Sequence, residues 1–312
     1  MLKKISVLLN VSAIILICTS FRVAPPITHS QNTLKTIVID AGHGGKDFGA
    51  KGSYSYEKNV TLAIALKLQA TLQEALPDVN IVMTRTTDIF DAPPVKANKA
   101  NNAKGDLFLC IHCNAAPAIR HSEITGYKTQ TYYTGKGSKK RKHTRKVPVY
   151  HTWTTPNPAK GTETYIWAAH KNDDKELAMR ENESLYIDST LAEQFEGFDP
   201  NSPEKRILYS LKTQQYFQRS ANLALDVEQE FTKIGRISRE ARQRQVGIWV
   251  LQATAMPSIL VETGYITNPE EEDYLNSVDG QQEICNAITQ AVAHYKTALE
   301  TNSFRNITDD TQ

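Results

Sequence analysis

The sequence predicts an α/β fold, a single domain with a mostly parallel central sheet of about six strands flanked by helices. Short β-branched and apolar runs alternate along the chain with longer segments in which apolar residues recur every three or four positions. This order is typical of strand–helix–strand units, which build parallel sheets. The 312 residues are 40% hydrophobic and 22% charged, which excludes a disordered chain and a collagen-like fibre.

The first strand and the first helix have the clearest patterns. The β-branched run Thr36–Asp40 predicts a strand, and the glycine-rich residues 41–45 end it. A helix is predicted over Glu57–Leu76, and it ends there because Pro77 cannot continue a helix. Apolar residues recur every four positions on one face of this helix, at Val60, Ile64, Leu68, Leu72 and Leu76.

The later elements follow the same order with less regular patterns. Further strands are predicted at residues 80–84, 107–112, 162–167, 248–251 and 258–261. Helices are predicted at residues 95–103, 175–183, 203–231 and 281–299. One more helix begins at Asn268, because an Asn N-cap followed by Pro and three Glu residues suits a first helical turn.

Residues 1–24 are interpreted as a signal peptide. Lys3 and Lys4 precede the apolar run Ile5–Cys18, whose fourteen residues are too few for a comfortable bilayer span. The mature chain is therefore expected to be exported, to the periplasm or the cell envelope. Lipidation at Cys18 and a retained N-terminal anchor stay open as alternatives, and membrane contact is expected only in those two cases.

The rest of the chain is divided into a linker (25–34), one domain (35–300) and a disordered tail (301–312). Within the domain, residues 118–160 hold ten Lys or Arg against one acid, and they are predicted to form an inserted loop or hairpin. This basic insert either binds an acidic partner outside the cytoplasm or only raises solubility. Nucleic acid is not expected as a partner of an exported protein. The net charge of +2 thus hides a basic insert in an acidic body.

Cys110 and Cys113 form a C-x-x-C pair, a spacing found in redox and zinc motifs. Both lie in a predicted strand, where residues three apart point to opposite faces. We therefore interpret them as small buried thiols.

Four side chains suited to metal-assisted hydrolysis fall at corresponding places in the pattern. His43 follows the first strand, Glu57 begins the first helix, His112 ends the third strand, and Glu262 follows the last strand. The carboxyl ends of parallel strands meet at one edge of a sheet, so these side chains are expected to lie close together. Two His and one Glu with an open position are a hydrolytic zinc set. A further carboxylate can take a proton from the water.

Six segments stand out in order along the chain: Val38–Gly45 (VIDAGHGG), Glu57–Asn59 (EKN), Met83–Asp88 (MTRTTD), Ile111–Ala115 (IHCNA), Gly161–Tyr165 (GTETY) and Ile259–Glu271 (ILVETGYITNPEE). Together they resemble the signature blocks of the zinc-dependent N-acetylmuramoyl-L-alanine amidases, type 3. The resemblance covers about Thr36 to Lys296, with the insert 118–160 outside it. Cys113 and Thr263 depart from the usual residues of the family, and neither is a proposed ligand.

The resemblance implies that His43, Glu57 and His112 bind Zn²⁺ and that Glu262 is the general acid/base. The reaction would cleave the amide bond between N-acetylmuramic acid and the L-alanine of the peptidoglycan stem peptide. Zinc would lower the pKa of its water to about 7 and polarise the amide carbonyl. Glu262 would take the water proton and return it to the leaving amine.

Further roles follow from the same resemblance. Asp40, Asn59 and Asn114 are candidates for orienting a ligand or the substrate. Residues 183–205 are a candidate regulatory segment, because some relatives place a helix in this region that a partner protein withdraws from the site; a peripheral structural helix is the alternative. Two other functions stay open: a catalytically inactive cell-wall-binding protein and a zinc carboxypeptidase acting on stem peptides.

Overall fold

The computed structural model describes residues 33–167, 203–244, 248–305 and 307. The expected signal peptide, most of the linker, the helix expected at 175–183 and most of the candidate regulatory segment lie outside the described residues. No helix in the described part of the chain is long and apolar enough to cross a membrane.

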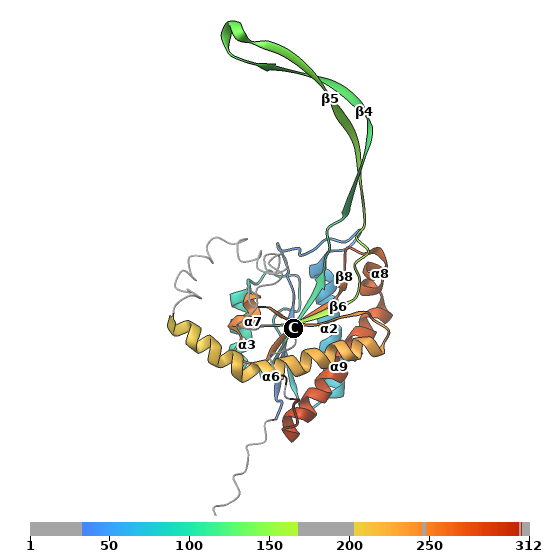
Figure 1. Cartoon of the computed structure of the whole chain (residues 1–312). Helices are drawn as coiled ribbons and strands as arrows, with labels where there is room; N and C mark the ends of the chain where they lie inside the picture. The colour runs from blue at the N-terminus through green and yellow to red at the C-terminus, as the bar shows by residue number, and fades with distance from the viewer. Residues whose placement is uncertain (1–32, 168–202, 245–247, 306, 308–312) are drawn as a thin grey trace, which may run out of the picture. The chain divides into compact units, whose positions relative to one another are not determined.

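A six-stranded sheet forms the centre of the domain (Figure 1). Its strands, in spatial order, are β2 (Asn80–Met83), β1 (Thr36–Ala41), β3 (Leu107–Asn114), β8 (Ser258–Tyr265), β6 (Thr162–Trp167) and β7 (Ser238–Arg244). The four strands β2, β1, β3 and β8 are parallel, whereas β6 pairs antiparallel with β8 and β7 pairs parallel with β6. The predicted mostly parallel sheet in an α/β domain is therefore confirmed.

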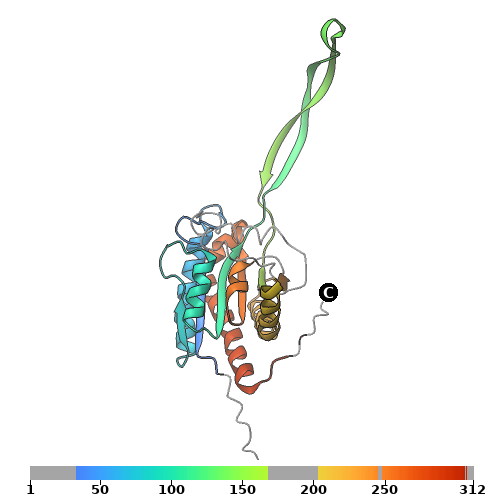
Figure 2. The ribbon, with the colours of Figure 1, turned by 90° about the vertical axis from the view of Figure 1, so that its left-hand side faces the viewer.

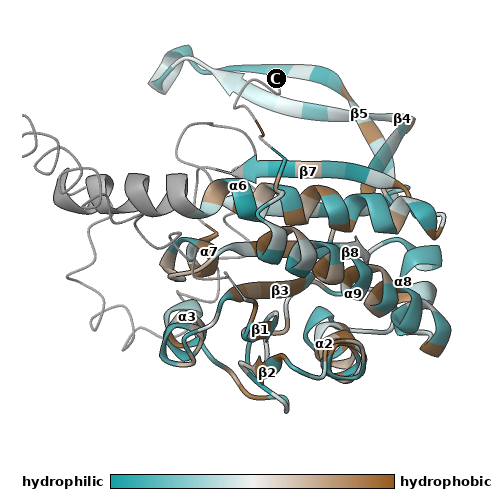
Figure 3. Ribbon diagram, turned by 90° about the horizontal axis from the view of Figure 1, so that it is seen from below, coloured by the Kyte–Doolittle hydropathy of each residue, from teal (hydrophilic) through white to brown (hydrophobic). Residues whose placement is uncertain are grey.

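Helices cover both faces of this sheet (Figure 3). One face packs against α2 (Glu57–Ala75), α6 (Pro203–Lys233) and α9 (Val278–Thr301), and together they form the larger hydrophobic core. The other face packs against α3 (Pro93–Asn102) and the short helix α7 (Trp249–Ala253). The short helix α8 (Pro269–Asn276) follows β8, and the side chain of Asn268 caps it as predicted by accepting from the backbone of Glu270 and Glu271.

The sequence prediction is wrong for one strand and missed another. Residues 248–251, predicted as a strand, begin helix α7, because a short apolar run fits a buried helical turn as well as a strand. The sixth strand is instead β7, whose sequence SREARQR lacks the apolar signal of a strand. It lies at the edge of the sheet, where one side is not covered by a further strand (Figure 3).

The basic insert is a long antiparallel hairpin of β4 (Ile119–Thr134) and β5 (Arg141–Thr155), with a 3₁₀ turn at Gly137–Lys139 near its tip. Of the two predicted forms, loop or hairpin, the hairpin is correct. Its two strands form a sheet of their own, and the ribbon extends away from the central sheet (Figures 1 and 2).

The start of the C-terminal tail is packed rather than disordered. Arg305 forms an ion pair with Asp226 of α6, and the Phe304 ring contacts Tyr295 of α9. The backbone N–H of Ile307 donates to the side chain of Gln218. The described residues after 301 therefore contact helices α6 and α9.

Candidate metal centre

The ends of two neighbouring strands bring His43 and His112 together. His43 lies in the turn after β1, and His112 lies near the end of β3, which pairs with β1. Their rings approach edge to face, with centroids 4.8 Å apart. Both side chains are buried, and Glu57 at the first position of α2 is fully buried between them.

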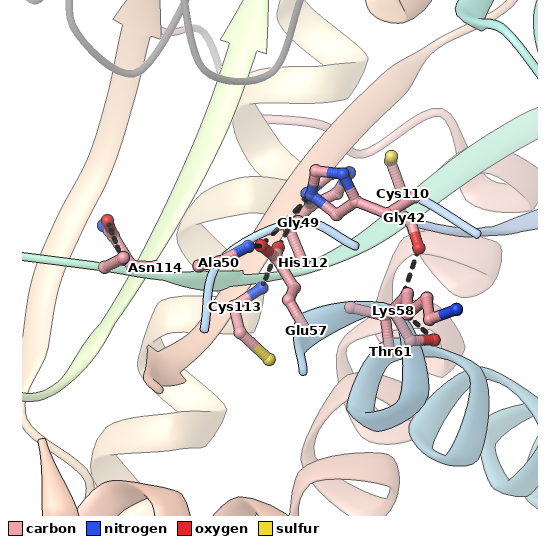
Figure 4. Close-up of polar contacts among 12 residues, drawn as sticks. Gly42, Gly49, Ala50, Glu57, Lys58, Thr61, Cys110, His112, Cys113 and Asn114 are labelled. Carbon is pink, nitrogen blue, oxygen red and sulfur yellow. Dashed lines mark hydrogen bonds and ion pairs between the residues drawn. The ribbon is translucent and has the colours of Figure 1, made fainter. Parts of the chain in front are cut away.

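Glu57 faces each imidazole with a different carboxylate oxygen. Its Oε2 lies 3.1 Å from Nε2 of His43, and its Oε1 lies 3.1 Å from Nδ1 of His112. The same two oxygens accept backbone N–H bonds, from Ala50 at 2.7 Å and from Cys113 at 2.9 Å (Figure 4). These two backbone bonds hold the carboxylate in the position from which it faces both imidazoles.

Asp47 orients the imidazole of His43. Its carboxylate accepts a 2.9 Å hydrogen bond from Nδ1 of His43, which leaves Nε2 of that ring pointing to Glu57. Such a carboxylate–imidazole pair is the usual support of a metal-binding histidine. Asp47 was not among the predicted site residues, although its position four residues after His43, in the same glycine-rich turn, is a sequence signal for it.

Two glycines make the room for this cluster. A Cβ on Gly42 would lie 2.5 Å from Nε2 of His112. A Cβ on Gly49 would lie 2.6 Å from the His43 ring and 2.7 Å from Oε2 of Glu57, and Gly49 also has a φ of +62°. The glycine-rich turn therefore allows the backbone to approach the ligands as well as to reverse direction.

The charges of the cluster are strongly coupled. Burial disfavours the charged form of His43, but the Glu57 and Asp47 carboxylates outweigh it and raise the pKa of His43 to about 9. Burial likewise disfavours the Glu57 carboxylate, yet the two imidazoles hold its pKa well below the usual range. Without a cation between them, a proton on His43 balances the buried carboxylate.

His43, Glu57 and His112 fit a divalent metal ion. One ligand atom from each lies within 4.8 Å of the others, and two nitrogens with one carboxylate oxygen are donors that suit zinc. Asp40, Cys110 and His112 form a second group with the same spacing. That group suits a cation poorly, because the Lys96 ammonium already lies 3.1 Å from Asp40.

Glu262 lies beside the cluster in the strand register. It is directly opposite His112 of β3 on one side and directly opposite Glu163 of β6 on the other. Directly opposed residues of neighbouring strands share a face of the sheet. Glu262 is fully buried and lies beside His112.

The three residues proposed to orient a ligand or substrate have different surroundings. Asp40 accepts hydrogen bonds from Thr84, Lys96 and Cys110. Asn114 donates to Glu163 at 3.0 Å. Asn59 is exposed on helix α2, so its position does not favour an orienting role.

Glu163 is the centre of a second buried polar cluster, which the sequence analysis did not identify as part of the site. Its carboxylate accepts from Asn114, from the hydroxyls of Tyr165 and Tyr265, and from Nε of Arg239 at 2.5 Å. Burial opposes its charge, but these donors lower the pKa of Glu163. In the sequence, Glu163 is the single acid of β6 and lies in the segment Gly161–Tyr165, one of the six that resemble the family.

A pocket opens on the same side of the sheet as the cluster. Asp40, His43, Lys96 and His112 line its polar side, and Ile248, Trp249 and Val250 of the α7 region line its apolar side. A substrate carbonyl that approached the two histidines would therefore meet an apolar wall on α7.

The cysteines are buried thiols, as predicted. Cys110, Cys113 and Cys285 are free and buried, and burial raises the pKa of Cys110 and of Cys285 to about 12. Thiols held in this form are poor nucleophiles and poor metal ligands. The C-x-x-C spacing is thus structural.

Comparison with models of known protein families shows which family this chain belongs to. Residues 37–294 match the model of the family Amidase_3, N-acetylmuramoyl-L-alanine amidase. The chain belongs to this family. All four residues His43, Glu57, His112 and Glu262 lie inside the matched region, and so does the whole hairpin.

Curated relatives and solved structures agree with this assignment. The chain is 29% identical over 262 residues to the amidase AmiC of Escherichia coli O6:H1, and 28% identical over 288 residues to the probable amidase AmiB of Haemophilus influenzae. These matches cover 83% and 87% of this chain but only 52% and 56% of the relatives, so the chain spans about half of their length.

Two solved structures share the fold. An N-acetylmuramoyl-L-alanine amidase from Clostridium difficile 630 is similar with a TM-score of 0.53, 23% identity and coverage of 85% of this chain and 98% of that one. The amidase AmiC2 of Nostoc punctiforme is similar with a TM-score of 0.51, 23% identity and coverage of 84% and 97%. At this level of identity the likeness concerns the fold of the domain.

Proposed function

We propose that this protein is a zinc-dependent peptidoglycan amidase, which hydrolyses the amide bond between N-acetylmuramic acid and the L-alanine of the stem peptide. The observation that carries the proposal is the buried cluster of His43, Glu57 and His112, with Glu262 directly opposite His112. Membership of the amidase family gives the substrate class.

His43, Glu57 and His112 would hold the ion, and the two histidines also line the pocket. Zinc held there supplies Lewis acidity toward a water molecule and toward the amide carbonyl. The carboxylates of Glu57 and Asp47 keep the two rings in place, since each is hydrogen-bonded to an imidazole. The ligands are therefore arranged before substrate binds.

Glu262 is the proposed general acid/base. It takes a proton from the attacking water and gives it to the nitrogen of the leaving L-alanine. Its position supports this role, because it is buried and lies directly opposite His112 in the strand register.

The proposed site of action is outside the cytoplasm. The interpretation of residues 1–24 as a signal peptide supports export, and a peptidoglycan substrate requires it. Residues 35–300 are the proposed catalytic domain. Regulation by residues 183–205 and by a protein activator stays a prediction, and a truncation of that segment without a gain in activity would contradict it.

Two other functions are less well supported. A cell-wall-binding protein without activity does not need a buried cluster of two histidines and two glutamates. A zinc carboxypeptidase would use the same ligands, and product analysis separates it from an amidase.

Incubation of the zinc-loaded protein with a purified muropeptide, followed by mass analysis, tests the proposal. An amidase releases the intact stem peptide. Loss of only the C-terminal residue of the peptide would support the carboxypeptidase, and absence of any product with and without a chelator would support the binding protein.

A further inference from the structure

We propose that the hairpin β4–β5 binds polymeric peptidoglycan, through the carboxylates of its stem peptides and the faces of its sugar rings. The proposal rests on the proposed function for the identity of the polymer. It adds a second contact with the substrate, separate from the metal centre.

The first observation is charge. The hairpin carries nine Lys or Arg residues and one acid, Glu123. All nine cations are exposed: Arg120, Lys128, Lys136, Lys139, Lys140, Arg141, Lys142, Arg145 and Lys146. Within the described residues none of the nine forms a salt bridge, whereas many cations of the domain body are paired. This positive charge is thus left for an external anion.

The second observation is the arrangement of aromatic rings. In the half of the hairpin near the domain, the Trp153 ring stacks between His121 and His151. In the other half, the Tyr132 ring stacks on His143 and lies under the guanidinium of Arg145. These contacts hold exposed rings flat on the ribbon before any ligand binds, which lowers the entropy cost of binding.

The rings and the cations occur together along the ribbon. Trp153 is 41% exposed, and four tyrosines of the hairpin are between 42% and 65% exposed. Each strand of 15 or 16 residues is about 50 Å long, enough to contact several sugar rings of a glycan strand. A polymer that alternates sugar rings with carboxylate-bearing peptides matches both kinds of side chain.

The tip of the hairpin disfavours a membrane as the partner. The loop between the strands reads Gly-Lys-Gly-Ser-Lys-Lys, without an apolar side chain to enter a lipid layer. An acidic face of a second copy of this chain would match the charge, but it would leave the exposed rings without a counterpart.

The base of the hairpin is fixed next to the metal centre. The ribbon begins five residues after Asn114 of β3 and returns seven residues before Thr162 of β6, the strand that holds Glu163. The backbone N–H of Ala116 donates to Thr267, and the side chain of Asn157 donates to the carbonyl of Pro117. A glycan strand held on the ribbon is therefore kept close to the proposed active site.

Binding is tested with the full-length protein carrying Glu262→Gln, so that the polymer stays intact. The variant Lys139→Gln, Lys140→Gln, Lys142→Gln is compared with the control Lys35→Gln, Lys104→Gln, Lys233→Gln, which removes three exposed charges from the body. Sedimentation with insoluble peptidoglycan is expected to show a Kd raised about tenfold for the hairpin variant at low salt, and by less than twofold for the control. Equal binding by both variants would overturn the proposal.

The rings are tested separately. Trp153→Ala is expected to weaken binding severalfold even at high salt, whereas Trp153→Phe keeps the ring and is expected to bind nearly as the parent. Stronger sedimentation with anionic vesicles than with peptidoglycan would overturn the proposal in favour of a membrane. Self-association that the hairpin variant loses would overturn it in favour of a second copy.

Activity separates this proposal from the proposed function. With Glu262 present, the hairpin variant is expected to cleave a soluble muropeptide with unchanged kcat/KM and to degrade the insoluble polymer more slowly. Hairpin-dependent binding by a protein without amidase activity would refute only the proposed function. Amidase activity with hairpin-independent binding would refute only the inference.

Discussion

His112 of β3 and Glu262 of β8 are directly opposed in the register of two neighbouring parallel strands. The proposed metal ligand and the proposed general acid/base thus share one face at the carboxyl end of the sheet. Both strands are buried along their whole length, so their relative position is set by the core of the domain rather than by a loop. Such support is what a site needs to hold its groups in a reactive geometry.

Glu262→Gln is expected to lower kcat by about 10²- to 10⁴-fold, because the side-chain amide of glutamine cannot take the proton from the water. Bound zinc is expected to stay at the level of the parent protein, since Glu262 is not one of the three ligands. Glu270→Gln is the control, because that side chain is 82% exposed on α8. A variant that lost zinc together with activity would place Glu262 in the ligand set.

Gly49→Ala is expected to remove zinc binding. Its Cβ would meet both His43 and Glu57, and the φ of +62° adds strain of about 1–2 kcal/mol. Gly235→Ala is the matched control, because Gly235 has a φ of +83° with no atom within 4 Å of its Cβ. Both variants should lose stability in denaturant unfolding through backbone strain, Gly49→Ala more so because of its clash, but only Gly49→Ala should lose bound zinc. Equal zinc content in the two would show that the turn does not shape the site.

Zinc binding is expected to release close to one proton from His43 at pH 7.5, in addition to the proton lost by zinc-bound water. His43 has a pKa raised to about 9 in the metal-free protein, so it is protonated there and must lose the proton to bind a metal. The His43 contribution should fall toward zero above pH 9, while that of the water stays. In the metal-free protein, the stabilisation from this charged histidine is complete below pH 6.5 and is lost as the pH rises through about 9. Calorimetry in buffers of different ionisation enthalpy measures the release, and a value that does not vary between pH 7 and 10 would contradict the assignment.

Glu163→Gln is expected to lower the free energy of unfolding by about 1.5–3 kcal/mol at pH 7, because Arg239 and two tyrosine hydroxyls lose a charged partner. The pKa of Glu163 is lowered from 4.5, so its contribution is present above pH 4.5 and is lost as the pH falls further. The difference between the variant and the parent should therefore shrink in acid. The exposed Glu74→Gln on α2 should show no such difference at either pH. A Glu163→Gln deficit that persisted unchanged in acid would show that the carboxylate charge is not the cause.

The sequence predicts most of the fold because the core elements carry strong local patterns. Helix α2 repeats apolar residues every four positions, and strands β1, β3 and β8 each contain an apolar run of three to five residues. Strand β7 lacks such a pattern because its side chains are polar at an edge, and α7 is too short for its period to be read. The path of the hairpin depends on pairing between residues up to 36 positions apart, which no local pattern contains.

Some residues of the proposed site can be predicted from the sequence, and others cannot. Ligands at strand ends can be predicted, because the topology of a parallel sheet places those ends at one edge. Asp47 and Glu163 act through side-chain hydrogen bonds whose partners are known only when the backbone is in place. Asn59 was proposed because it closely follows Glu57 in the sequence, and in the structure its side chain is exposed on helix α2.

Hydrolysis of a purified muropeptide in H₂¹⁸O tests the central claim most directly, with zinc-loaded protein compared with protein stripped by a chelator. The account predicts that ¹⁸O enters the lactyl carboxylate of N-acetylmuramic acid, that the peptide leaves unlabelled with a free L-alanine amine, and that stripping abolishes both products until zinc is restored. Label in a peptide carboxylate, or equal cleavage after stripping, would contradict it.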